Sequence, residues 1–133
     1  MCGRFYLDAS TEQLIAHFGL VDAAPQAPRY NISPSQPVAV VRQKPGGPVL
    51  SMLRWGLVPS WAKQAKSPYS MINARAETVA VKPAWRRLFR ERRGLIPATG
   101  FYEWQAGQDG KQPFSIGLRE RGIMAFAGLW DRW

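Results

Sequence analysis

The sequence predicts an α+β domain with a curved, largely antiparallel sheet. Two observations favour this class. Many short runs rich in β-branched and aromatic residues are separated by glycine and proline turns, whereas only two stretches have the spacing of an amphipathic helix. Long loops connect these elements, an arrangement typical of α+β proteins. With 133 residues the chain can bury a core of its own, so we expect one domain over residues 1–133.

The first helix is expected after a capping box at residues 10–13. Ser10 has the side chain of an N-cap, and Gln13 stands where it can reach back to the Ser10 backbone. Gly19 is a natural end for this helix. The chain's single histidine, His17, falls on the flank opposite the apolar face, and we expect it to have no functional role.

The region after the first helix is expected to be a loop followed by two strands. Residues 21–37 are rich in proline, alanine and glutamine and are expected to form an irregular loop. Residues 38–42 are expected to form a strand. The turn at residues 45–48 should then lead into a second strand at residues 49–55.

A second helix is expected from Pro83 to Arg93, with Gly94 at its end. One face of this segment is apolar and the other is rich in arginine, which a solvated face would also explain. Four further strands are expected at residues 95–98, 100–104, 113–118 and 123–129. Asp109-Gly110 supplies a hairpin turn between the second and third of these strands.

The charge composition favours a polyanionic partner. Eighteen lysines and arginines against nine acidic residues give a net charge of +9 and a pI near 10.5. Nucleic acid is the commonest partner of so basic a domain, although basic residues also keep proteins soluble. Arginine, which dominates around residues 75–93, matches phosphate oxygens through its planar fork.

The composition also excludes several kinds of site. One cysteine rules out an internal disulfide framework and a cysteine-cluster metal centre, and it suits a reducing, cytoplasmic setting. One histidine disfavours a zinc centre or a Ser-His-Asp triad, so we expect no metal and no cofactor. The chain shows neither an apolar run long enough for a membrane span nor a signal peptide. We expect a monomer without membrane contact.

The only cysteine, Cys2, follows the initiator methionine directly. Removal of Met1, which a small second residue permits, would give Cys2 a thiol and a free α-amine on adjacent carbons. Both groups titrate near neutral pH. The amine of such an aminothiol attacks a carbonyl to give an imine, and the thiol then closes a thiazolidine ring. The alternative is a small hydrophobic residue that lies near a terminus by chance.

Four segments together resemble one family. They are Met1-Cys2-Gly3-Arg4-Phe5, Arg29-Tyr30-Asn31-Ile32-Ser33-Pro34, Trp55-Gly56-Leu57-Val58-Pro59-Ser60-Trp61 with Ile72-Asn73-Ala74-Arg75-Ala76-Glu77-Thr78, and Pro97-Ala98-Thr99-Gly100-Phe101-Tyr102-Glu103-Trp104. In this order they resemble the SOS-response-associated peptidase (SRAP) family, whose members sense and shield abasic sites in single-stranded DNA. The resemblance covers essentially the whole chain and implies a barrel-like sheet with a few short helices.

The resemblance implies a catalytic role for three residues. Cys2 would form a thiazolidine with the ring-opened abasic deoxyribose, and Glu103 would transfer protons. Asn73 would orient the sugar hydroxyl or the Cys2 amine through neutral hydrogen bonds. Structural alternatives exist for two of them, because Asn73 could cap a helix and Glu103 could be an outward-facing strand residue.

Four residues match the family's DNA contacts. Arg4 and Arg75 correspond to arginines that contact phosphates, with pairing to a nearby glutamate as the alternative. Pro34 and Trp61 correspond to positions that wedge or stack against the bases beside the lesion, a contact that tolerates any base. A plain aromatic core is the alternative for Trp61.

Two features depart from the family pattern. The family's catalytic histidine lies in a later His-x-Arg-x-Pro segment that nothing here matches, and Ala62 stands where the family has a second adjacent tryptophan. The last expected strand stops almost at the end of the chain, beside Trp130 and Trp133. We therefore expect the sequence to be truncated, with the C-terminal part of the family domain missing.

Three other functions remain open. Met-Cys-Gly also begins glutamine amidotransferases, in which the N-terminal cysteine attacks an amide. A non-catalytic module that binds single-stranded DNA would explain the charge but not the position of Cys2. The family name also suggests autoproteolytic release of the first residue and peptidase activity, for which the sequence shows no dedicated protease site.

Overall fold

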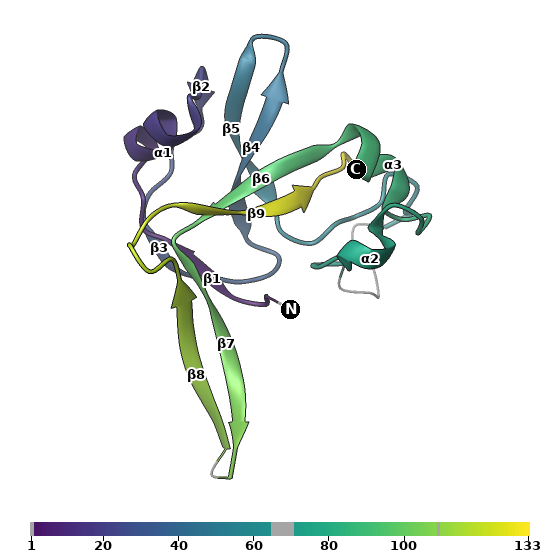
Figure 1. Ribbon diagram of the computed structural model, residues 1–133. Helices are drawn as coiled ribbons and strands as arrows, with labels where there is room; N and C mark the ends of the chain where they lie inside the picture. The colour runs from purple at the N-terminus through teal and green to yellow at the C-terminus, as the bar shows by residue number, and fades with distance from the viewer. Residues whose placement is uncertain (1, 65–70, 109) are drawn as a thin grey trace.

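The strands of the protein form two sheets in a computed structural model that describes residues 2–64, 71–108 and 110–133 (Figure 1). The first sheet has the order β3 (Arg29–Ile32), β1 (Phe5–Leu7), β7 (Gly100–Gly107) and β8 (Gly110–Gly117). The second has the order β2 (Asp22–Ala23), β5 (Gly47–Arg54), β4 (Pro37–Lys44), β6 (Arg93–Ala98) and β9 (Met124–Leu129). Among the described strands only the short β2–β5 pair is parallel. The predicted α+β class with mostly antiparallel sheets is confirmed, and both sheets are open rather than closed into a barrel.

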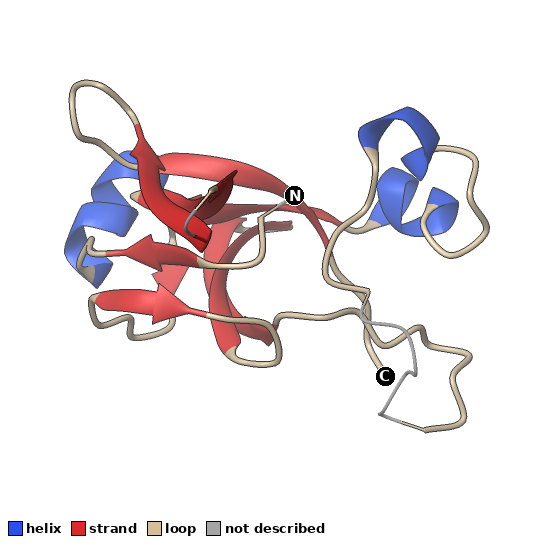
Figure 2. Ribbon diagram, turned by 90° about the horizontal axis from the view of Figure 1, so that it is seen from below, coloured by secondary structure: helices blue, strands red, loops and turns tan. Residues whose placement is uncertain are grey.

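Three short helices flank the sheets in the described residues: α1 (Thr11–Phe18), α2 (Ala76–Val79) and α3 (Arg86–Glu91). Helix α1 lies at one end of the molecule, and α2 and α3 lie together at the other end (Figure 2). The predicted capping box is confirmed, because Ser10 accepts a bond from the Gln13 N–H and the Gln13 side chain accepts one from the Ser10 N–H. Gly19 ends the helix with a left-handed φ of 60°, where a residue with a side chain would be strained.

Two predictions, one about a loop and one about a helix, are wrong. Residues 21–37 are not wholly irregular, because β2 and β3 lie within them as short edge strands. Their polar, partly exposed residues lack the alternation that identifies a strand from sequence. The helix expected over residues 83–93 is limited to α3, and Gly94 lies inside β6 instead of ending the helix. A Cβ at Gly94 would lie 3.0 Å from the Val41 carbonyl oxygen, so this glycine permits close strand packing.

The other predicted strands are confirmed with altered bounds. Residues 38–42 and 49–55 correspond to β4 and β5, and residues 95–98 and 123–129 correspond to β6 and β9. The β7–β8 hairpin is longer than predicted and projects from the body of the molecule as an arm (Figure 1). Its strands close where Gly107 pairs with Gly110, while Asp109 of the predicted turn lies outside the described residues.

The core joins the two sheets and fixes the strand that follows the N-terminus. Buried side chains come from β1, α1, β3, β4, β5 and β6. Phe5 and Leu7 of β1 are 3% and 1% exposed, and β1 is paired on both edges, with β3 and β7. Cys2 packs against this core as a half-buried side chain. The residues just before β1 are therefore anchored to the centre of the molecule.

None of the helices in the described residues has the length and apolar character that crossing a bilayer requires.

Candidate active site at Cys2

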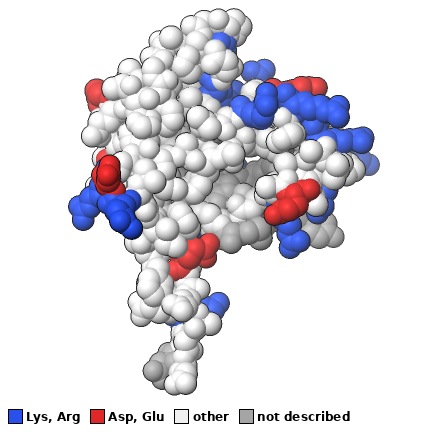
Figure 3. Space-filling view, in the orientation of Figure 1, with Lys and Arg blue, Asp and Glu red and all other residues white. Residues whose placement is uncertain are grey.

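Cys2 and Asn73 line one large, mainly apolar cleft of about 1310 Å³. Its walls come from the second sheet, from the segments around α2 and α3, and from residues 130, 131 and 133 near the end of the chain. Figure 3 shows a hollow between the sheets and these helices, with lysine and arginine side chains gathered over α3. A mainly apolar cleft with a few polar groups is the usual form of a small-molecule or reactive site.

The backbone of Cys2 is tethered to Asn73. The Asn73 Nδ2 donates a hydrogen bond of 2.8 Å to the Cys2 carbonyl oxygen, and the Cys2 thiol donates a weak bond of 3.6 Å to the Arg4 carbonyl oxygen. Both bonds join neutral groups. The tether fixes the Cys2 backbone, from which the thiol and, once Met1 is removed, the free amine extend on adjacent carbons.

The segment that carries Asn73 is held by the chain that follows β5. The Trp55 indole Nε1 donates to the Ile72 carbonyl oxygen at 3.0 Å, and the Leu57 N–H donates to the Met71 carbonyl oxygen at 3.0 Å. Asn73 does not cap a helix, because Arg75 occupies the N-cap position of α2. The alternative structural role for Asn73 is thus excluded.

Glu103 lies close enough to Cys2 to affect its thiol. Strand β7 pairs with β1, and the Tyr102 N–H donates to the Arg4 carbonyl oxygen at 2.9 Å, so the chain around residue 103 lies beside residues 2–4. Partial burial raises the pKa of the Cys2 thiol, a backbone hydrogen bond at Arg4 offsets part of that rise, and the charge of Glu103 adds to it. Glu103 is itself half-buried.

Arg4 points toward β3. Its guanidinium donates to the Asn31 side-chain oxygen at 2.8 Å, while its Nε is buried and has no partner among the described residues. The Tyr102 hydroxyl donates to the Tyr30 carbonyl oxygen at 2.9 Å and joins the same two strands. Sequence reasoning missed Asn31 as the partner that orients Arg4, although Asn31 lies within one of the four matching segments.

All four predicted DNA contacts, Arg4 included, lie outside the cleft lining. Pro34 is half-buried in the turn after β3. Trp61 is 75% exposed on the turn formed by residues 59–62, so the core alternative for this side chain is excluded. Arg75 is exposed at the start of α2 and forms no ion pair with another described residue. His17 stacks against Phe18 on α1 and does not line the cleft.

The family model described as "SOS response associated peptidase (SRAP)" matches residues 1–133. The chain belongs to the SRAP family. Its fold agrees with solved structures: a Bacteroides thetaiotaomicron protein superposes with a TM-score of 0.84 at 22% identity, covering 97% of this chain and 61% of that chain.

Curated relatives of this SRAP chain are named abasic site processing proteins. YoaM of Bacillus subtilis is 42% identical over 100% of this chain and 60% of its own length. YedK of Escherichia coli is 33% identical over 87% of this chain and 53% of its own length. The chain thus spans about three-fifths of the length of the relatives it matches over its full extent, a share consistent with the expected truncation.

Proposed function

We propose that this chain processes abasic sites by linking Cys2 covalently to the ring-opened deoxyribose of single-stranded DNA. The observation that carries the proposal is the Asn73–Cys2 tether inside the cleft, with Glu103 within electrostatic reach of the thiol. This arrangement presents an aminothiol, a neutral orienting amide and a carboxylate together. The names of the curated relatives support the same lesion as the target.

The proposed reaction has two bond-forming steps and releases one water. After Met1 is removed, the Cys2 amine adds to the aldehyde carbon, and loss of the carbonyl oxygen as water gives an imine. The thiol sulfur then bonds to the same carbon while its proton goes to the nitrogen, which closes the thiazolidine. Glu103 takes a proton from the attacking amine and returns it to the departing oxygen. Asn73 holds the Cys2 backbone throughout without competing for protons.

Four residues provide the proposed DNA contacts. Arg4 and Arg75 neutralise phosphates, and the exposed side chain of Arg75 is available for such a contact. Trp61 stacks on a base, for which its 75% exposure leaves the ring available, and Pro34 wedges beside it. The net charge of +9 supports a polyanionic partner.

The same proposal covers a lyase-type reaction, a peptidase step and the state in which the protein acts. The imine stage permits β-elimination of the 3′ phosphate, a lyase-type side reaction. Release of Met1 would be the peptidase step. We propose that the protein acts as a cytoplasmic monomer with single-stranded DNA as its partner.

The experiment that tests the proposal mixes the protein with single-stranded DNA that contains one abasic site. We expect an adduct that survives denaturation, no adduct from Cys2→Ala, and none from protein that retains Met1. Cys2→Ser is the matched control: it keeps the amine and should form an imine that only borohydride reduction traps. An undiminished heat-stable adduct from Cys2→Ala would overturn the mechanism, and glutamine hydrolysis without an adduct would favour the amidotransferase alternative.

A further inference from the structure

Among the described residues, the exposed indole of the Trp61 turn (residues 59–62) has no hydrogen-bond partner. The Ala62 N–H donates to the Pro59 carbonyl oxygen at 2.9 Å and closes the turn. In the part of the chain that the structure describes, the Trp61 ring makes no contact with another aromatic ring. The position of the indole therefore depends on what holds the backbone of the turn.

Two residues near the end of the chain hold that backbone on both sides of Trp61. The Ser60 N–H donates to the Asp131 Oδ2 at 3.2 Å. The Trp133 Nε1 donates to the Ala62 carbonyl oxygen at 2.9 Å. Each bond joins residues 71 positions apart in the sequence, so neither is a local feature of the turn.

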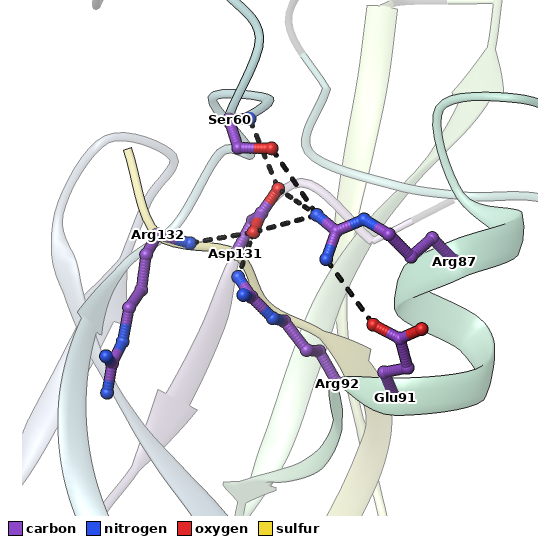
Figure 4. Close-up of polar contacts among 6 residues, drawn as sticks. All are labelled: Ser60, Arg87, Glu91, Arg92, Asp131 and Arg132. Atoms are coloured by element: carbon purple, nitrogen blue, oxygen red, sulfur yellow. Dashed lines mark hydrogen bonds and ion pairs between the residues drawn. The ribbon is translucent and has the colours of Figure 1, made fainter.

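Asp131 is itself fixed by charged partners (Figure 4). Its side chain is 3% exposed, and both oxygens are bonded. Arg87 donates to Oδ2 at 3.1 Å, Arg92 pairs with Oδ1, and the Arg132 N–H donates to Oδ1 at 2.9 Å. Arg87 also donates to the Ser60 hydroxyl at 3.4 Å, so the cluster contacts the turn twice. A carboxylate held this way has little freedom to move, and the turn bonded to it shares that restraint.

This cluster divides the arginine-rich segment around α3 into two groups. Arg87, whose side chain is 44% exposed, and Arg92 are paired with the buried carboxylate of Asp131. Arg86, Arg90 and Arg93 are exposed. An arginine-rich pattern that suggests phosphate contacts in the sequence thus also builds the support beneath the Trp61 turn.

We propose that Asp131 and Trp133 are positioning residues that clamp the Trp61 turn and pre-orient its indole for stacking on a DNA base. The inference rests on the proposed function, because it assigns a support to the stacking residue. A rigid turn lets the indole stack without first being ordered, whereas a loose turn would lose part of the stacking free energy to ordering.

The test is a double-mutant cycle on affinity for single-stranded DNA. Trp61→Ala should weaken binding about fivefold or more, as loss of one stacked base predicts. Asp131→Asn should weaken binding about threefold or more in the parent protein and cause no further loss in Trp61→Ala. Removing a negative charge by itself strengthens DNA binding, so charge cannot explain the expected weakening.

Glu91→Gln is the matched control, because Glu91 is an exposed carboxylate 3.5 Å from Arg87 and does not touch the turn. It removes the same charge and should leave affinity unchanged or slightly increased. Trp133→Phe removes the indole N–H donor and keeps an aromatic ring, though a smaller one, at an exposed position. This variant tests the proposal if Asp131→Asn does not fold. Trp133→Phe should likewise weaken DNA binding in the parent protein and cause no further loss in Trp61→Ala.

Additive losses, or unchanged affinity in folded Asp131→Asn and Trp133→Phe, would overturn the clamp. Unchanged affinity in Trp61→Ala would overturn it as well, because there would be no stacking to orient. The Cys2 adduct assay reports on the proposed function separately: a parent protein that forms no adduct contradicts that function whatever the cycle shows.

Discussion

Two residues that line the same cleft, Cys2 and Asp131, belong to regions that are held by different chemistry. Cys2 is held by neutral hydrogen bonds to Asn73 and to the Arg4 carbonyl oxygen. The Trp61 turn is held through Asp131, whose carboxylate is paired with two arginines. Both Cys2 and Asp131 line the cleft, yet only the support of the Trp61 turn depends on formal charges.

The difference corresponds to what each part is proposed to do. A reactive aminothiol must gain and lose protons, and a neutral amide can orient it without fixing either group in one protonation state. A stacking residue undergoes no proton transfer, so its support can use strong, charge-assisted hydrogen bonds. Acid should therefore loosen the Trp61 turn, whereas the Cys2 tether should be insensitive to it.

Loss of the Cys2 tether should have the largest effect. Asn73→Ala removes the 2.8 Å bond to the Cys2 carbonyl oxygen and frees the backbone that carries both reactive groups. We expect the rate of adduct formation at saturating DNA to fall about 100-fold, as misplacement of reacting groups by about 1 Å predicts. DNA affinity, measured by fluorescence anisotropy, should change less than about twofold. A fall in affinity that accounted for the whole loss of rate would assign Asn73 to DNA binding instead.

Loss of the Asp131 carboxylate from its ion pairs should have a smaller effect, on the free energy of unfolding, and this effect should depend on pH. Burial acts to raise the pKa of the Asp131 carboxyl, but N–H groups of Arg132 and Ser60, together with Arg87 and Arg92, outweigh it and hold the pKa below its ordinary value. A depressed pKa stabilises the fold above the pKa of the unfolded chain, and this contribution is lost as pH falls through the folded value. Asp131→Asn should therefore lower the free energy of unfolding by about 1–3 kcal/mol at pH 7.

Urea unfolding at pH 7 and at about pH 3 measures this dependence. The difference between Asp131→Asn and the parent should shrink at the lower pH, where the parent carboxyl begins to protonate. Glu91→Gln, which removes an exposed partner of Arg87, should change stability by less than about 0.5 kcal/mol. An Asp131→Asn effect of equal size at both pH values would show that shape, not charge, holds the cluster.

The sequence predicted the helices and strands that are specified by neighbouring residues, but not those that depend on contacts with distant segments. The Ser10–Gln13 capping box and Gly19 specify α1 within ten residues, and apolar runs identified β4, β5 and β6. The edge strand β3 was missed because its residues carry no alternation and its pairing with β1 is decided by distant chain. Gly94 was assigned to a helix end because the close approach of β4 is invisible in the sequence.

In the candidate site, too, residues marked by local motifs were predicted and contacts between distant segments were not. The unusual position of Cys2 and the four family segments identified Asn73 and Glu103, and the structure brings Asn73 and Glu103 close to Cys2. The cluster around Asp131 could not be predicted, since its bonds to Ser60 and Arg87 span 71 and 44 positions. In the sequence, the segment around Asp131 indicated only that the chain is truncated.

The smallest expected effect concerns the carboxylate charge that acts on the Cys2 thiol. Glu103 contributes to the raised pKa of the thiol, after burial as the main cause. Glu103→Gln should move that pKa toward lower pH, because it removes a negative charge that disfavours the thiolate. The chain has a single cysteine, so the pH dependence of iodoacetamide alkylation in the free protein reports this pKa without requiring the adduct reaction. Glu77→Gln, which removes an exposed carboxylate on α2 that does not contribute to the thiol pKa, should leave the profile unchanged. An identical profile in Glu103→Gln would show that the charge of Glu103 does not set the thiol pKa, which would then depend on burial, the backbone hydrogen bond at Arg4 and the N-terminal charge.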